Sequence, residues 1–189
     1  MGNLTFILGG ARSGKSGLAQ RLAKEQAGEN VLYVATLRET PETLADPEMN
    51  ERIIRHRASR PSAWHTLVLG EHPLQELAQA IAKRTRKPTV LLDCLSMLIS
   101  GQLFMGEALP IDAEGEAARL VQALVALQQH SDTDWIVVSN EVGLSVVPET
   151  ASGRLYRDAL GRANQVLAHS ADRVYFVIAG IVQQIKGAS

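Results

Sequence analysis

A glycine-rich stretch near the start of the chain constrains its fold more than any other feature. Residues 9–16 read Gly-Gly-Ala-Arg-Ser-Gly-Lys-Ser, which has the Gly-x-x-x-x-Gly-Lys-Ser spacing of a phosphate-binding loop. The apolar run Leu4–Leu8 precedes it, and a helical pattern begins at Lys15. Strand, loop and helix in this order form the context in which such a loop binds a nucleoside triphosphate. A chance glycine turn followed by Lys-Ser explains the flanking elements far less well.

The residue types in this loop have separate physical roles. Glycine lets the backbone curl so that successive N–H groups face phosphate oxygens, and the helix N-terminus adds partial positive charge. We expect Lys15 to act as a catalytic residue at the β- and γ-phosphates, and the Ser16 hydroxyl to bind Mg²⁺. The predicted nucleotide-binding residues of the loop are Gly9, Gly10, Ala11, Arg12, Ser13, Gly14, Lys15 and Ser16.

Short apolar runs alternate with helical patterns along the rest of the chain. The predicted strands are Leu4–Leu8, Val31–Ala35, Thr66–Leu69, Val90–Cys94, Trp135–Ser139, Val174–Ala179 and Ile181–Ile185. The predicted helices are Lys15–Ala27, Pro47–Ser59, Leu74–Lys83, Ala113–Gln129 and Ser152–Ala168. Several strands are apolar throughout, as in parallel sheets covered on both faces. We therefore predict one α/β domain over residues 1–189, a P-loop NTPase fold of the RecA-like type with a mostly parallel central sheet and helices on both faces.

The ligands of such a sheet gather at the carboxyl ends of its strands. Two irregular stretches, Leu37–Pro47 and Gly101–Pro110, are expected to form loops over an active site there. Asp46 and Pro47 suit the N-cap and the first position of the helix that follows the first stretch.

Composition and charge exclude several classes of protein. The net charge is −1 with five histidines taken as neutral, so no global field attracts nucleic acid, and none is expected as a partner. Apolar runs stay well short of the ~20 residues of a membrane-spanning helix. The single Cys94 and the lack of a leader pattern favour a cytoplasmic protein.

An acidic residue ends one of the predicted strands. Asp93 follows Val90-Leu91-Leu92 and could bind Mg²⁺ together with Ser16, although it could also be an ordinary carboxylate where a strand meets solvent. Its neighbour Cys94 is expected to be a small buried filler rather than a nucleophile.

A histidine lies within a basic helical stretch. His56 comes three residues after Ile53 and seven after Met49, so we expect it on their inward stripe. Its cationic neighbours in the sequence are Arg52, Arg55, Arg57 and Arg60. Nearby cations disfavour the protonated imidazole, and guanidinium groups suit phosphate oxygens, so His56 could be a nucleophile at phosphorus. Taken alone, the stretch fits a solvated basic helix with an incidental histidine better than it fits a helix that carries a nucleophile.

The ordered motifs together resemble one enzyme family, the bifunctional adenosylcobinamide kinase/adenosylcobinamide-phosphate guanylyltransferases of cobalamin biosynthesis. Besides the loop, they are Tyr-Val-Ala-Thr at 33–36, His-Arg-Ala-Ser-Arg-Pro at 56–61, Trp64, Leu-Leu-Asp-Cys at 91–94, Ser-Asn-Glu-Val-Gly at 139–143, Val-Pro-Glu at 147–149 and the segment 154–165. The combination of the His56 segment with Asn-Glu-Val-Gly carries most of the specificity.

The resemblance implies a reaction for His56. In that family a histidine attacks the α-phosphate of GTP, expels pyrophosphate and carries GMP. It also implies ATP and GTP as substrates with Mg²⁺, adenosylcobinamide and its phosphate as further substrates, and a homotrimer with sites between subunits. Further nucleotide contacts are implied for Ala35, Thr36, Leu37, Arg57, Ala58, Ser59, Arg60 and Glu71. The sequence departs from the family pattern Trp-x-Thr-x-Glu, because Trp64-His65-Thr66 is followed by Leu67 and Val68. Glu71, the first carboxylate after them, would take the role of the pattern's Glu after a small register change.

Asn140 and Glu141 follow the predicted strand Trp135–Ser139. Glu141 could orient a substrate hydroxyl or a metal-bound water, or it could simply pair with an arginine. The polar residues Arg154, Arg157, Asp158 and Arg162 share one helix and could serve substrate binding, a subunit interface or solvated pairs. Trp64 and Trp135 are expected to be packing residues, and the other histidines lack the spacing of a zinc site.

Two other functions remain open at this point. One is a monofunctional P-loop kinase in which His56 supports a substrate anion. The other is a RecA-like nucleotide-dependent module that acts on nucleic acid, against which the near-zero net charge and the absence of a basic–aromatic surface argue.

Overall fold

The computed structural model describes residues 2–38, 40, 44–58, 60–104 and 109–187. These residues form a seven-stranded sheet in the order β3-β2-β4-β5-β1-β6-β7. The strands are β1 Leu4–Gly9, β2 Val31–Ala35, β3 His65–Val68, β4 Thr89–Asp93, β5 Trp135–Asn140, β6 Arg173–Ile178 and β7 Ile181–Lys186. Neighbouring strands are parallel, apart from β7, which pairs with β6 in the antiparallel sense.

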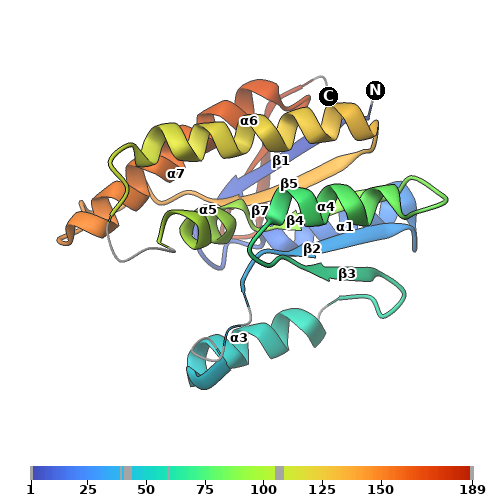
Figure 1. Cartoon of the computed structure of the whole chain (residues 1–189), viewed down its shortest axis with the longest axis horizontal. Coiled ribbons are helices and arrows are strands. Elements are labelled where there is room, and N and C mark those ends of the chain that lie inside the picture. Colours follow the sequence, from blue (N-terminus) through green and yellow to red (C-terminus); the bar gives the residue numbers. More distant parts are fainter. Residues whose placement is uncertain (1, 39, 41–43, 59, 105–108, 188–189) are drawn as a thin grey trace.

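Helices cover both faces of the sheet (Figure 1). They are α1 Lys15–Ala27, α3 Pro47–Ala58, α4 Pro73–Ala82, α5 Leu95–Leu103, α6 Ala113–Ser131 and α7 Ala151–Ser170. Buried residues of α1, such as Leu18, pack with Ile7 and Leu91 on one face. Buried residues of α4, α5, α6 and α7 pack with alternate strand residues, such as Phe6, on the other. The predicted α/β architecture with a mostly parallel sheet is confirmed.

Each predicted strand and helix is present, with ends that agree within two residues. One helix was missed. The sequence analysis assigned no element to Leu95–Ser100 and placed a loop from Gly101, whereas α5 continues to Leu103, so the start of that loop was wrong. Because α5 follows β4 almost directly, has only nine residues and mixes small polar residues with its apolar ones, its period of 3.6 residues is hard to see. Its buried residues are Leu95, Ser96, Leu98, Ile99 and Leu103.

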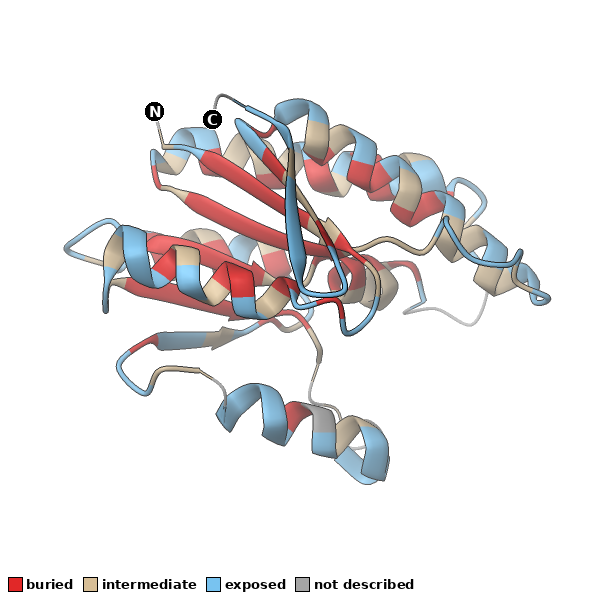
Figure 2. Ribbon diagram, turned by 180° about the vertical axis from the view of Figure 1, so that it is seen from behind, coloured by how far each residue is buried: buried red, intermediate tan, exposed pale blue. Residues whose placement is uncertain are grey.

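Helix α3 stands apart from the other helices, beyond the edge strand β3 (Figures 1 and 2). Asp46 begins it as predicted, because its carboxylate accepts hydrogen bonds from the N–H groups of Glu48 and Met49 at 2.9 and 3.2 Å. Among the described side chains of α3, only Ile53 is buried. His56 is exposed, so the prediction that it shares the inward stripe of Ile53 was wrong. A helix anchored by one apolar side chain has no wide buried face.

The stretch Leu37–Pro47 lies only partly within the described residues, because 39 and 41–43 fall outside them. In the described part of the chain, no helix is both long and apolar enough to cross a bilayer.

Candidate active site

The phosphate loop connects the buried end of β1 to α1 and is held from both sides. The N–H of Glu141, after β5, donates to the Gly9 carbonyl at 2.9 Å. The N–H of Gly180, in the turn between β6 and β7, donates to the Ser13 carbonyl at 2.9 Å. Gly14, at the N-cap of α1, has a φ of 101°, a left-handed conformation that favours glycine. The predicted loop residues therefore form a tight turn whose shape is set by the neighbouring strands.

Lys15 begins α1, and its side chain is buried against the loop, with 7% of the residue exposed. Its ammonium donates a hydrogen bond to the Gly10 carbonyl. Burial lowers the pKa of Lys15, whereas the nearby Cys94 and Asp93 raise it. Phosphate oxygens beside this ammonium would favour its charged form in the same way.

Asp93 ends β4 within electrostatic reach of Lys15. Its Oδ2 accepts a hydrogen bond from the Tyr33 hydroxyl at 2.8 Å. Burial, and next the negative charge of Asp93, raise the pKa of Tyr33, so this hydroxyl keeps its proton. A carboxylate and the Ser16 hydroxyl are hard oxygen donors of the kind Mg²⁺ prefers, so the donor set fits the predicted metal. No cluster of three or more His, Cys, Asp or Glu suited to a metal occurs among the described residues.

Thr36 fixes the chain that follows Asp93. Its hydroxyl donates to the Cys94 carbonyl at 2.7 Å and accepts from the Cys94 N–H at 2.9 Å. The Thr36 side chain thus joins the ends of β2 and β4, a role that the resemblance did not imply. Burial, and next the charge of Asp93, raise the pKa of Cys94 to about 11, so the thiol is protonated at neutral pH. This agrees with the interpretation of Cys94 as a filler.

Asn140, at the end of β5, is the centre of a polar network next to the phosphate loop. Its amide donates to the Ser96 hydroxyl at 2.9 Å, and its backbone carbonyl accepts from the Asn164 amide at 3.1 Å. The next residue, Glu141, accepts a hydrogen bond from the Gly143 N–H and bonds the loop through its own N–H. Asn140 and Glu141 therefore lie beside the phosphate loop, as expected from the order of the strands.

The basic segment after α3 meets the site through one side chain. The guanidinium carbon of Arg60 lies 4.0 Å from the ring centroid of Tyr33. Farther along, Trp64 is buried and its indole N–H donates to the Gly28 carbonyl at 3.0 Å, a packing role as predicted. His56, Arg57 and Ala58 are exposed on α3, and Ser59 lies outside the described residues.

The remaining predicted residues lie along the carboxyl edge of the sheet. Ala35 pairs in register with Asp93, and Leu37 follows it partly buried. Glu71 is exposed after β3, on the far side of β2 from Asp93. The nearby Glu76 caps α4 by accepting from the N–H groups of Gly70 and His72.

The polar cluster of α7 is engaged locally. Arg154 donates to the carbonyls of Pro148 and Glu149 at 3.0 and 2.7 Å, and Arg157 pairs with Asp158 at 2.9 Å. These contacts all lie within residues 148–158.

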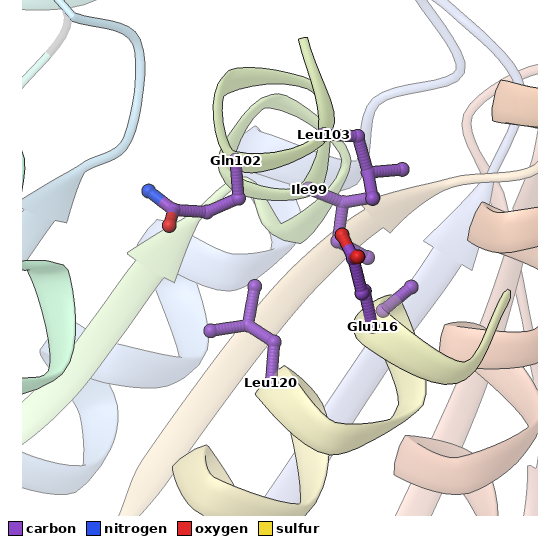
Figure 3. A pocket seen from close by; sticks show the side chains of 6 residues that line it. Ile99, Gln102, Leu103, Glu116 and Leu120 are labelled. Atoms are coloured by element: carbon purple, nitrogen blue, oxygen red, sulfur yellow. The ribbon is translucent and has the colours of Figure 1, made fainter. Parts of the chain in front are cut away.

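Two cavities lie away from the phosphate loop. One of about 150 Å³ lies between α5 and α6, where Gln102 and Glu116 supply the polar side chains of an otherwise apolar lining (Figure 3). A more open one of about 480 Å³ lies beside β3 and carries Lys83, Arg84 and Arg86, which follow α4, where cations are favoured by the helix dipole. Neither cavity is lined by a predicted site residue. The candidate active site is therefore identified by its residue types and their contacts, and not by a cavity.

Comparison with known proteins bears on the same residues. Residues 5–185 match the family model described as cobinamide kinase/cobinamide phosphate guanyltransferase. The chain belongs to this family. It is 40% identical over 182 residues to the bifunctional adenosylcobalamin biosynthesis protein CobP of Pseudomonas aeruginosa, with 96% of both chains covered. It is 36% identical over 190 residues to CobU of Escherichia coli, with 97% of this chain and 99% of the relative covered. The predicted resemblance is confirmed, and the chain is an enzyme of the cobinamide kinase/cobinamide phosphate guanyltransferase family.

Solved structures support the fold of this family member. A solved ATPase domain matches with a TM-score of 0.53 at 16% identity, covering 92% of this chain and 68% of that one. The flagellar accessory protein FlaH of Methanocaldococcus jannaschii matches with a TM-score of 0.50 at 18% identity, covering 98% and 78%. The RecA-like P-loop fold is therefore confirmed.

Substitution of Gly9 by Ala tests how tightly the loop is packed. A Cβ at this position would lie 2.3 Å from the Val177 carbonyl, so the loop or β6 must shift. Overpacking of this kind costs about 1–3 kcal/mol, and we expect nucleotide affinity to fall about tenfold or more in a fluorescent-nucleotide titration. Gly161→Ala in α7 is the control, since nothing lies within 4 Å of its added Cβ. Equal affinity of the two variants would contradict the packing argument.

The pKa of Cys94 predicts how fast it is alkylated. With a pKa of about 11, about one thiol in a thousand is ionised at pH 8, and the rate with iodoacetamide should rise about tenfold per pH unit up to pH 10. Intact-mass measurement follows the reaction directly, because Cys94 is the single cysteine of the chain. The urea-unfolded chain should react far faster at pH 8. A plateau below pH 9 in the folded protein would contradict the raised pKa.

Proposed function

We propose that this enzyme phosphorylates the hydroxyl of adenosylcobinamide with ATP or GTP and then transfers GMP from GTP to the new phosphate. The observation that carries the proposal is the phosphate loop with Asp93 and Glu141 beside it, in a chain that matches the family over residues 5–185. The products of the second step are adenosylcobinamide-GDP and pyrophosphate.

Phosphoryl transfer depends mainly on positioning and on neutralising charge. The loop N–H groups and Lys15 hold the γ-phosphate while the substrate hydroxyl oxygen attacks its phosphorus. The bond to the bridging oxygen breaks, and the nucleoside diphosphate leaves. Glu141 is our candidate to accept the hydroxyl proton, because its backbone is bonded to Gly9. Mg²⁺ bound by Ser16 and Asp93 would offset the charge on the phosphate oxygens.

Guanylyl transfer uses the α-phosphate of GTP instead. A nitrogen of His56 attacks that phosphorus, the bond to the α,β-bridging oxygen breaks and pyrophosphate leaves. An oxygen of adenosylcobinamide phosphate then attacks the same phosphorus and breaks the bond to nitrogen. The proposal requires α3 to bring His56 to the loop, within one protomer or across the homotrimer that the resemblance implies. Among the described side chains of α3 only Ile53 is buried, which supports such a movement because little apolar surface must leave the core.

The further nucleotide contacts proposed for this step come from the segments around α3 and β2. Arg57, Ala58, Ser59 and Arg60 follow His56 directly, and Ala35, Thr36 and Leu37 lie at the end of β2. Among them, Arg60 has the best support, since its guanidinium lies over Tyr33, next to Asp93. Glu71 is retained as the proposed guanine-side carboxylate at the end of β3.

Substitution of His56 by Ala tests the covalent step. We expect the wild type to gain the mass of one GMP on incubation with GTP and Mg²⁺, and His56→Ala to gain none. Cobinamide-dependent release of nucleoside diphosphate should persist in that variant. His169→Ala, an exposed histidine at the end of α7, is the matched control and should label normally. Acid-labile GMP labelling of His56→Ala would contradict the assignment.

The exposure of His56 favours one alternative, a monofunctional cobinamide kinase in which the histidine does not react. The same experiment separates the two functions. A wild type that releases diphosphate in the presence of cobinamide but never gains a GMP would establish the alternative.

A further inference from the structure

Tyr33 combines complete burial with polar contacts at two places. It lies in the middle of β2 with 0% of the residue exposed, packed with aliphatic side chains such as Val31 and Leu91. Its hydroxyl donates to Asp93 Oδ2 at 2.8 Å, and the guanidinium of Arg60 lies over its ring at 4.0 Å from the centroid. One buried side chain therefore contacts both the proposed metal carboxylate and the segment that follows the histidine helix.

From this geometry we propose that Tyr33 is a positioning residue that orients the Asp93 carboxylate with its hydroxyl and seats Arg60 with its ring. One side chain thereby positions a residue of each region, Asp93 beside the phosphate loop and Arg60 in the His56 segment. This inference rests on the proposed function, because it assigns Asp93 to the metal and Arg60 to guanylyl transfer.

The Tyr33 hydroxyl limits the orientation of the Asp93 carboxylate. With Oδ2 accepting from Tyr33, Asp93 cannot rotate freely, and Oδ1 is left for a metal ion or its bound water. Partners of this kind fix the orientation of metal-binding carboxylates, and their loss typically weakens metal affinity about 10- to 100-fold. The backbone adds a second constraint, because the chain after Asp93 is tied to Thr36 by two hydrogen bonds.

The ring limits where Arg60 can lie. A guanidinium over an aromatic face is attracted to it by the ring quadrupole, and the attraction grows as the pair is removed from water. Arg60 Nε is buried and makes no hydrogen bond within the described residues. The Tyr33 ring lies against the guanidinium, and while burial raises the pKa of the Tyr33 hydroxyl, the Arg60 charge lowers it, so both parts of Tyr33 hold this side chain. Arg60 follows His56 by four residues, and Trp64 follows four residues later, anchored at Gly28. Arg60 therefore ties the chain to the sheet between the histidine and the Trp64 anchor.

Two substitutions at Tyr33 separate the two contacts. Tyr33→Phe removes the hydroxyl and keeps the ring. We expect the Mg²⁺ concentration for half-maximal phosphorylation to rise about tenfold, with kcat at saturating Mg²⁺ nearly unchanged. Tyr33→Leu removes the ring as well, and its rate of GMP labelling should fall a further several-fold. Tyr175→Phe is the control, since this partly buried strand tyrosine packs on the same apolar cluster and its hydroxyl makes no hydrogen bond among the described residues.

A double-substitution cycle with Tyr33→Phe and Asp93→Asn tests whether Tyr33 acts through Asp93, even if Tyr33→Leu is unstable. In the Asp93→Asn variant, adding Tyr33→Phe should not change the Mg²⁺ dependence any further. Arg60→Ala should slow GMP labelling without moving the Mg²⁺ dependence of phosphorylation. Thermal unfolding of every variant shows whether a loss reflects misfolding, and Tyr33→Phe with Arg60→Ala suffices if Tyr33→Leu fails to fold.

Each outcome decides a separate point. An unaltered Mg²⁺ dependence in Tyr33→Phe, or effects of Tyr33→Phe and Asp93→Asn that simply multiply, would overturn the positioning role. A wild type lacking phosphorylation or GMP labelling would instead overturn the proposed function itself. Wild-type activity in both assays with an unresponsive Tyr33→Phe leaves that function standing and rejects only the role of Tyr33.

Discussion

The site depends on how the phosphate loop is held between its neighbours. The hydrogen bond from Glu141 to Gly9 joins the loop to the end of β5, and the one from Gly180 to Ser13 joins it to the turn after β6. Both partners follow strands that flank β1 in the sheet. Because strand pairing and these two bonds hold the loop, less binding energy is spent on ordering it when a phosphate binds. The same pairing brings Asp93, Asn140 and Glu141 to the edge where that phosphate would lie.

Local patterns were sufficient to predict most of this arrangement. A loop motif between a strand and a helix, and apolar runs ending in Asp93 and Asn140, specify the edge of a parallel sheet without any distance information. Contacts between residues far apart in sequence could not be predicted in that way. No sequence pattern predicted a role for Tyr33 beyond its place in the Tyr-Val-Ala-Thr motif, although a tyrosine in an aliphatic strand needs a partner for its hydroxyl. Helix α5 was missed because it is short, follows β4 almost directly and has Ser96 on its buried side. His56 was placed inward because its spacing from Ile53 and Met49 does not show whether a partner surface exists.

Two phosphorus atoms of one nucleotide demand different surroundings. The γ-phosphate needs a rigid cradle, which the loop provides with its buried Lys15. The α-phosphate needs a nucleophile that arrives, reacts and is later released to a second substrate. An exposed histidine on a helix with one buried anchor suits that second task better than a side chain fixed in the core. In the proposed function the two tasks thus fall to different parts of the same chain, and Tyr33 and Arg60 are in contact between them.

The position of α3 between β2 and the outermost strand β3 has an evolutionary consequence. After β2 the chain leaves the sheet, forms α3 and returns as β3, which pairs with the outer side of β2. The segment between β2 and β3 can therefore change length without any other strand changing partners. Insertions, deletions and substitutions there leave the pairing of β1, β4 and β5 unchanged. Under the proposed function, the margin of the sheet is therefore where a lineage could alter or abandon nucleotidyl transfer and still keep the phosphate loop folded.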